Sequence, residues 1–174
     1  MFLKVFSILT FASLVELKVI PDVEDSVICP GYKFFDMDLS NVEFDYDDDG
    51  YITVNGNFTY LKDIIAPYPL YVRSEHMERG EWRTGIVNRN IPDFCAVIQK
   101  PTEVWYPITK QLSQKYCPYK AGYVARIDNV RYKFPVIIPR HFLGEWKMYI
   151  EQRDATRNTN TSSCVMQHVS VIDI

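Results

Sequence analysis

The sequence lacks the short motifs that mark most catalytic, metal and phosphate-binding sites. With only 7 glycines among 174 residues, it contains no glycine-rich phosphate loop and no Gly-x-Ser-x-Gly turn of a serine hydrolase. The three histidines, His76, His141 and His168, form no His-Glu-x-x-His pattern, and no two cysteines are spaced Cys-x-x-Cys. The sequence therefore predicts no enzyme, no catalytic residue, no metal and no cofactor. A triad dispersed along the chain would leave no such motif and stays open as an alternative.

An excess of positive charge is also missing. The formal net charge is −3, which gives no electrostatic basis for binding a phosphate backbone, so we expect no nucleic-acid partner. The hydrophobic fraction of 47% and the charged fraction of 24% are typical of a folded globular protein, and the length suits one domain.

The only candidate targeting segment is at the N-terminus. Lys4 is followed by an apolar run over 5–15, which has the length and charge layout of a secretory signal and is too short to span a bilayer. We expect a signal peptide over 1–18, a single domain over 19–174 and a secreted, extracellular protein. An N-terminal core helix is the alternative.

Four cysteines and two glycosylation acceptors agree with export. An even number of cysteines in a secreted chain predicts disulfides, and four allow three connectivities. We favour Cys29–Cys164, which closes a long loop, together with Cys95–Cys117, which closes a short one. The acceptors are Asn57 in Asn-Phe-Thr and Asn160 in Asn-Thr-Ser.

Most of the chain has the pattern of short strands. In 51–60, four apolar residues alternate with polar ones, and Gly56 marks either a β-bulge, which we favour, or a tight turn with Asn55. Further segments rich in aromatic and β-branched residues are 32–39, 68–77, 82–88, 94–98, 123–128, 146–151 and 164–174. The pattern predicts an all-β fold, an antiparallel sandwich or barrel.

One segment is predicted to be helical, and one resembles half of a calcium loop. Ile108, Leu112 and Tyr116 are spaced as on one helix face, so we expect a helix within 107–116. The acidic run 45–50 matches the first half of a calcium loop, but a glycine stands where the bidentate glutamate belongs. A solvated hairpin turn is the better interpretation of that run.

Apolar and aromatic residues are concentrated around the expected helix and in a proline-broken segment after it. Such residues either fill the core or line a pocket for an apolar ligand, and the sequence favours neither. The candidate cavity residues are Trp105, Ile108, Leu112, Tyr116, Phe134, Val136, Ile138, Phe142 and Trp146.

A set of short motifs occurs in order along the chain. They are Gly56-Asn57-Phe58-Thr59-Tyr60, Pro92-Asp93-Phe94-Cys95, Cys117-Pro118-x-x-x-Gly122, Gly144-x-Trp146-Lys147 and the late Cys164. Together they resemble the insect CheB group of secreted chemosensory proteins, which is similar to the ganglioside activator and related ML-like lipid-recognition domains. The resemblance covers most of the chain from about residue 29 onward.

The resemblance implies a β-cup, an antiparallel sandwich whose sheets splay around an apolar cavity, with a short helix near the cavity mouth. It implies a Cys29–Cys164 disulfide and places the segment 95–117 beside the mouth. The chain lacks the additional cysteines of the activator, which argues against ganglioside as the ligand.

The resemblance further implies a non-catalytic binder of lipid or long-chain hydrocarbon in gustatory, pheromone-related detection, with a sensory-neuron membrane receptor as a further partner. Two alternatives remain: a secreted protein-interaction module with a packed core, and a secreted lipid hydrolase with a dispersed site.

Overall fold

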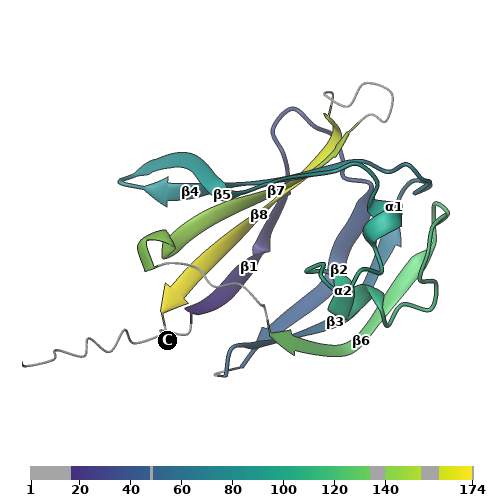
Figure 1. Ribbon diagram of the computed structural model, residues 1–174, viewed down its shortest axis with the longest axis horizontal. Coiled ribbons are helices and arrows are strands. Elements are labelled where there is room, and N and C mark those ends of the chain that lie inside the picture. The colour runs from purple at the N-terminus through teal and green to yellow at the C-terminus, as the bar shows by residue number, and fades with distance from the viewer. Residues whose placement is uncertain (1–16, 48, 134–139, 154–160, 174) are drawn as a thin grey trace, which may run out of the picture.

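The computed structural model describes residues 17–47, 49–133, 140–153 and 161–173, and these form two antiparallel β-sheets that face each other (Figure 1). The larger sheet has the order β1-β8-β7-β4-β5 and the smaller sheet the order β2-β3-β6. The large-sheet strands are β1 (Leu17–Ile28), β4 (Leu70–Glu78), β5 (Glu81–Ile91), β7 (Gly144–Arg153) and β8 (Thr161–Asp173). The small-sheet strands are β2 (Met37–Tyr46), β3 (Tyr51–Tyr60) and β6 (Val124–Lys133). The fold is the predicted all-β antiparallel sandwich.

The helical elements are short. They are α1 (Phe94–Val97), α2 (Tyr106–Thr109) and the single 3₁₀ turn η1 (Arg140–Phe142). None of the helices in the described part of the chain is long and apolar enough to cross a membrane.

The alternation that predicted strands also places the core between the sheets. In β3 the even-numbered residues Ile52, Val54, Phe58 and Tyr60 are buried, and Ala125, Ile127 and Val130 of the neighbouring β6 join them in one cluster. This cluster extends to Leu70 and Ile91 of the large sheet and to Phe94, Ile98 and Leu112 of the helical region. Residues on alternate positions of facing strands therefore make one continuous core.

Gly56 lies within β3, but the bulge predicted there is wrong. From Val54 to Gly56 β3 advances two residues, whereas β6 advances three, from Val130 to Ile127, so the extra residue is in β6. The strand continues through this position, and the register with β6 shifts between Val54 and Gly56. Gly56 has a φ of +107°, and a Cβ there would lie 1.9 Å from the backbone oxygen of Asn41 on β2. Only glycine allows β2 and β3 to approach so closely with this backbone conformation.

The helix expected within 107–116 is much shorter than predicted. It ends at Thr109, because the Gln99 side chain donates to the Thr109 carbonyl at 2.8 Å, and the Thr109 hydroxyl donates to the Ile98 carbonyl at 2.7 Å. A contact between distant segments therefore occupies the carbonyl that a longer helix would use.

The segment 94–98, expected as a strand, is instead the helical turn α1. The Asp93 carboxylate accepts hydrogen bonds from the backbone amides of Cys95 and Tyr68, both at 3.0 Å. An aspartate that caps the first turn overrides the β-type composition of this short segment.

Both disulfides are present in the favoured pairing. Cys29–Cys164 joins the end of β1 to β8, and Cys95–Cys117 joins α1 to the segment before β6. Cys117 precedes a cis-proline, Pro118. The first bond lies on the outer face of the large sheet and the second fastens the helical region.

Candidate functional site

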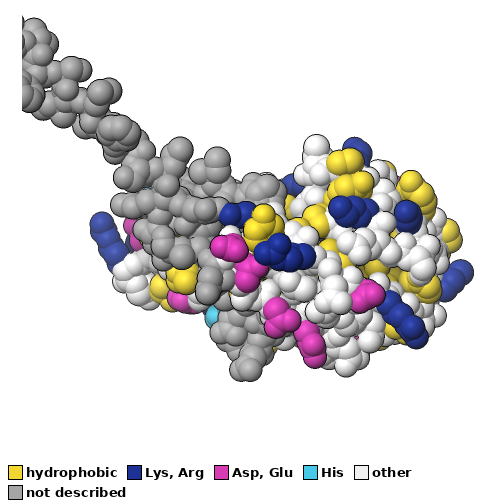
Figure 2. All heavy atoms as spheres, turned by 90° about the horizontal axis from the view of Figure 1, so that it is seen from below, with side chains coloured by type: hydrophobic (Ala, Val, Ile, Leu, Met, Phe, Trp, Pro, Cys, Tyr) yellow, Lys and Arg dark blue, Asp and Glu magenta, His cyan; other side chains and the backbone are white. Residues whose placement is uncertain are grey.

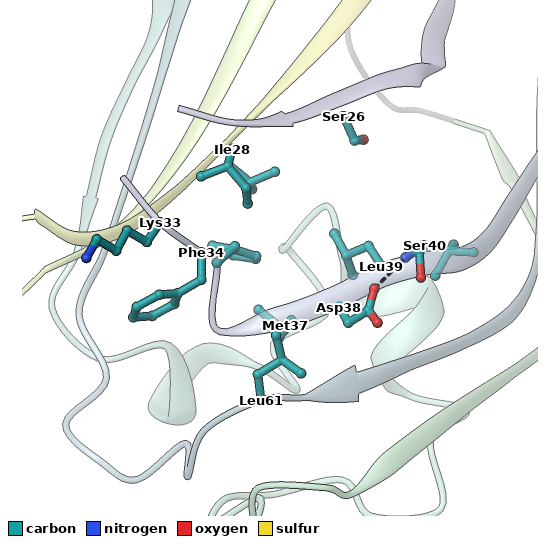
Figure 3. A pocket seen from close by; sticks show the side chains of 12 residues that line it. Ser26, Ile28, Lys33, Phe34, Met37, Asp38, Leu39, Ser40 and Leu61 are labelled. Atoms are coloured by element: carbon teal, nitrogen blue, oxygen red, sulfur yellow. Dashed lines mark hydrogen bonds between the residues drawn. The ribbon is translucent and has the colours of Figure 1, made fainter. Parts of the chain in front are cut away.

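A cavity of about 520 Å³ lies at the neighbouring edges of the two sheets, between β1 and β2 (Figure 3). This volume is in the range of small-molecule and lipid sites in proteins. The lining residues come from the end of β1, the connection to β2, β2 itself and two later positions, namely Ser26, Ile28, Lys33, Phe34, Phe35, Met37, Asp38, Leu39, Ser40, Val42, Leu61 and Val165.

The connection from β1 to β2 brings its aromatic residues to the cavity because a buried polar contact anchors it. Asp36 is buried, and its carboxylate accepts a hydrogen bond from the Tyr68 hydroxyl at 2.8 Å. The Asp36 carbonyl accepts from the Leu61 amide at 2.8 Å. This anchoring holds Phe34 and Phe35, on one side of Asp36, against the cavity.

A bulge in β2 determines which of its side chains face the cavity. The register with β3 shifts between Asp38 and Asn41, so one extra residue is inserted in β2. The alternation of side chains therefore shifts by one position along the strand, between Met37 before the bulge and Val42 after it, and Leu39 lies within the bulge. All three of these apolar residues line the cavity.

Apolar side chains are exposed at the rim of the cavity. Ile28, Leu39 and Leu61 line it and keep 41%, 37% and 50% of their surface accessible. In the view of Figure 2, hydrophobic side chains lie on the surface among lysine, arginine and acidic side chains. Exposed aliphatic residues that converge on a hollow are typical of a binding site for an apolar ligand.

A second pocket, of about 180 Å³ and called the inner pocket below, also adjoins β2. The two share Met37, Leu39 and Val42, so they meet at β2. The inner pocket is lined by residues of both β2 and the helical region, namely Met37, Leu39, Val42, Phe44, Phe58, Tyr60, Phe94, Ile98, Trp105, Ile108, Thr109 and Ile127. Its lining surface is wholly apolar. A ligand group with hydrogen-bonding atoms would lose its contacts with water in this pocket, so the pocket suits an apolar group.

The helical wall of the inner pocket is fixed by an ion pair and a disulfide. Glu103 is 4% exposed, and its two carboxylate oxygens accept hydrogen bonds from the Arg89 guanidinium at 2.6 and 2.7 Å. The guanidinium also lies 5.7 Å from the ring of Trp105. These contacts and Cys95–Cys117 hold Trp105 over the pocket.

Polar side chains gather at one end of the wider cavity. Asp38 Oδ1 accepts a hydrogen bond from the Ser40 amide at 3.0 Å, and Ser26 donates a short hydrogen bond to Gln167 Oε1. Hydrogen bonds from the Ser40 amide and hydroxyl hold the pKa of the Asp38 carboxyl below its ordinary value. Asp38 is therefore ionised at neutral pH.

The candidate cavity residues around the helix lie in three different environments: the inner pocket, the packed core and the surface. Trp105 and Ile108 line the inner pocket together. Leu112 is 1% exposed and belongs to the packed core, and Tyr116 is 65% exposed at the surface. Tyr116 faces solvent because the helix expected to turn it inward ends at Thr109.

The remaining candidates lie elsewhere. Trp146 and Phe142 pack with Val169 and Val171 in a separate cluster, where the Trp146 indole donates to the Phe142 carbonyl at 2.9 Å. Phe134, Val136 and Ile138 lie outside the described residues.

One of the two predicted glycosylation acceptors lies among the described residues. Asn57 is half-buried, on the face of β3 opposite to the core residues. Asn160 lies outside the described residues. Glycosylation at both stays a prediction.

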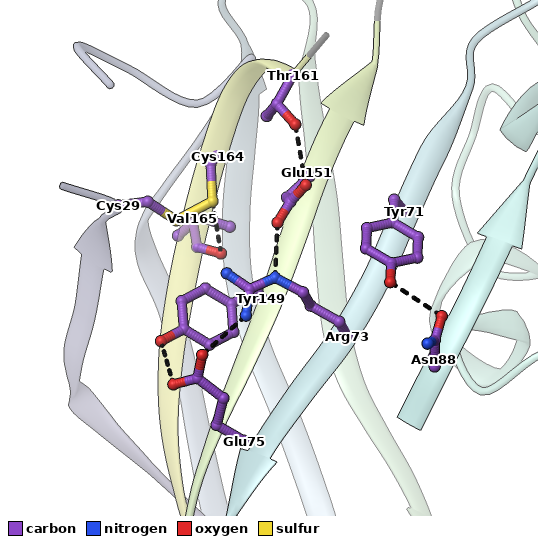
Figure 4. Close-up of polar contacts among 10 residues, drawn as sticks. All are labelled: Cys29, Tyr71, Arg73, Glu75, Asn88, Tyr149, Glu151, Thr161, Cys164 and Val165. Atoms are coloured by element: carbon purple, nitrogen blue, oxygen red, sulfur yellow. Dashed lines mark hydrogen bonds and ion pairs between the residues drawn. A yellow bond between two sulfur atoms is a disulfide. The ribbon is translucent and has the colours of Figure 1, made fainter. Parts of the chain in front are cut away.

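The outer face of the large sheet carries a polar network (Figure 4). Arg73 stacks on Tyr149 at 3.7 Å from the ring centre and pairs with Glu75 and Glu151 at 2.9 and 2.8 Å. The Tyr149 hydroxyl donates to Glu75 at 2.8 Å, and burial, followed by this hydrogen bond, raises the pKa of Tyr149 to about 12. Each member has a partner, so this network stabilises the sheet.

The described residues contain no group of three or more His, Cys, Asp or Glu side chains that could hold a metal ion. The acidic turn between β2 and β3 is occupied otherwise: the Asp47 carboxylate accepts from the Tyr51 amide at 2.8 Å and pairs with Arg131 at 2.5 Å.

Sequence reasoning missed the wall of the larger cavity. Phe34, Phe35, Met37 and Leu39 were assigned to a strand and given no role in binding. A signal was present: four apolar residues gather in six positions directly after the first cysteine and are followed by polar residues. The bulge that shifts the inward-facing side of β2 has no signal in the sequence of that strand.

Comparison with known proteins found similarity to solved structures alone. No protein-family model matches the chain. No curated protein matches it. Among solved structures, the chain is similar to chicken MD-1 complexed with lipid IVa, at 11% sequence identity and a TM-score of 0.40, over 90% of this chain and 97% of that chain. A similarity of this level identifies neither a family nor a ligand for the chain.

Proposed function

We propose that this protein is a non-catalytic binder of a lipid or a long-chain hydrocarbon. The carrying observation is the cavity of about 520 Å³ between β1 and β2, together with the wholly apolar pocket of about 180 Å³ that shares Met37, Leu39 and Val42 with it. Exposed aliphatic residues at its rim support an apolar ligand that enters from solvent.

The dimensions suit a single alkyl chain. A methylene group occupies a volume close to the roughly 30 Å³ share of one liquid water, so the inner pocket holds about six methylenes. Each buried methylene contributes about 0.8 kcal/mol, so a dodecyl chain supplies on the order of 9 kcal/mol before the cost of association. With an association cost of at least about 4 kcal/mol, roughly 5 kcal/mol remains, which corresponds to sub-millimolar affinity without a charged contact.

The biological setting is a further part of the proposal. The order of motifs that resembles the CheB group supports a secreted chemosensory protein, with a signal peptide over 1–18 and a mature domain over 19–174. Two disulfides support an oxidising compartment. In this role the protein presents its ligand to a receptor on a sensory neuron.

The test is binding of a neutral phenylnaphthylamine fluorophore to the wild type and to two tryptophan variants. Leu39→Trp places an indole where the two cavities meet, and Ile86→Trp is the matched control because Ile86 is 50% exposed on β5 and lines neither cavity. We expect Leu39→Trp to weaken binding at least tenfold and Ile86→Trp to leave it unchanged. Equal binding by both variants would place the ligand elsewhere, and no binding by the wild type would refute the proposal.

A further inference from the structure

The larger cavity has a group of three polar side chains at one end and Lys33 at the other. In Figure 3 Ser26, Asp38 and Ser40 lie at one end, whereas Ile28, Phe34, Met37 and Leu61 occupy the rest. A ligand that lies along this cavity therefore meets several polar groups at the end formed by Ser26, Asp38 and Ser40. The chemistry of that end indicates which head group the site selects.

The polar end offers lone pairs and few hydrogens. The single hydroxyl hydrogen of Ser26 is used in its bond to Gln167 Oε1. The amide and the hydroxyl of Ser40 are both directed to the Asp38 carboxylate. An ionised carboxylate only accepts hydrogen bonds, so what remains for a ligand is a set of acceptors with one negative charge.

The cation that lines the cavity lies apart from this group. Lys33 extends away from Asp38, Ser40 and Ser26 at the opposite end of the view in Figure 3. An anionic head placed beside Asp38 would thus meet like charge without a compensating partner. A head that carries donor hydrogens would meet acceptors only.

From this geometry we infer that the site selects a single-chain amphiphile whose head donates hydrogen bonds, a hydroxyl or an ammonium group, and that Asp38 recognises this head. The inference rests on the proposed function, since it assumes that the alkyl chain occupies the cavity. The chain runs from the polar end past Met37 and Leu39 into the apolar inner pocket. Carboxylate-headed chains of the same length are disfavoured.

The experiment compares dodecanol, dodecylammonium and dodecanoate by titration calorimetry at pH 7, below their aggregation concentrations. We expect dodecanol and dodecylammonium to bind about tenfold tighter than dodecanoate, as one charge-assisted hydrogen bond would give. In Asp38→Asn the amide oxygen still accepts from the Ser40 amide, so the turn is retained. This variant should bind dodecylammonium about tenfold more weakly and dodecanoate more tightly.

Lys33→Gln is the matched control because it also removes one charge from the cavity lining. We expect it to leave the order of the three probes unchanged. Equal affinities for the three probes, or tightest binding of dodecanoate with its loss in Lys33→Gln, would overturn the inference and leave chain binding intact. Failure of all three probes to bind the wild type would instead refute the proposed function itself.

Discussion

The two disulfides are expected to differ in how much they stabilise the fold. Each restricts the unfolded chain in proportion to the logarithm of the loop it closes. Cys29 and Cys164 are 135 residues apart, whereas Cys95 and Cys117 are 22 apart. The loop-entropy relation gives about 5 kcal/mol for the longer loop and about 3.4 kcal/mol for the shorter one at room temperature.

Local packing also favours a larger stabilisation by the Cys29–Cys164 bond than by the Cys95–Cys117 bond. Cys29 and Cys164 are 5% and 1% exposed and pack with Tyr149 and Met166, so their replacement also loses buried contacts. We therefore expect the double variant Cys29→Ala/Cys164→Ala to lose more free energy of unfolding than Cys95→Ala/Cys117→Ala, by at least about 1.5 kcal/mol.

The assay is equilibrium unfolding in urea, followed by tryptophan fluorescence, with both double variants and the wild type under the same conditions. The free energy of unfolding is taken by linear extrapolation, and both variants should show a larger dependence on urea because their unfolded chains expose more surface. If the short-loop variant proves equally or more destabilised, the entropic reasoning is refuted, and the helical region must contribute more to stability than its packing indicates.

Three further predictions concern stability. Gly56→Ala should destabilise by more than about 3 kcal/mol or prevent folding, whereas Gly31→Ala, also at positive φ but with open space around its Cβ, should cost about 1 kcal/mol in urea unfolding. Tyr149 has a pKa raised to about 12 in the fold, above its value near 10 in the unfolded chain, so the free energy of unfolding should fall as the pH rises from about 10 to 12. Tyrosinate absorbance should then rise together with the loss of near-UV circular dichroism. A gradual rise in absorbance while the fold stays intact would contradict this. Arg89→Gln should lower the free energy of unfolding by about 3 kcal/mol because it leaves the buried Glu103 carboxylate unpaired. Glu103→Gln should lower it by about 1 kcal/mol because Arg89 is 47% exposed. Thermal unfolding that shows the reverse order would refute the assignment of burial.

The fold could be predicted from the sequence because its signals are local. Apolar residues alternate along β3, and each strand follows a turn with polar or glycine residues, so period and composition agree. The close backbone approach at Gly56 was also predictable, since a glycine inside an alternating strand indicates a bulge or such an approach. In the structure Gly56 makes the close approach to β2, and the bulge lies opposite it, in β6.

The helical region could not be predicted in detail because distant residues determine it. The Gln99 side chain ends α2 by binding the Thr109 carbonyl, and the Asp93 cap turns a β-type segment into α1. The cavity between β1 and β2 depends on a bulge in β2 and on the Tyr68–Asp36 contact across 32 residues. Composition therefore indicated that apolar residues could line a pocket, but it did not indicate that the end of β1, β2 and the connection between them line the larger cavity.

Native mass spectrometry of the full chain expressed in eukaryotic cells tests the central claim most directly. The account predicts a co-purified ligand with one long alkyl chain at a ratio near one to one, which organic extraction removes and dodecanol replaces. A mass of the protein alone that is unchanged after incubation with dodecanol, longer alcohols and alkenes would contradict it, and the cavity at β1 and β2 would then have no role in carrying a lipid or hydrocarbon.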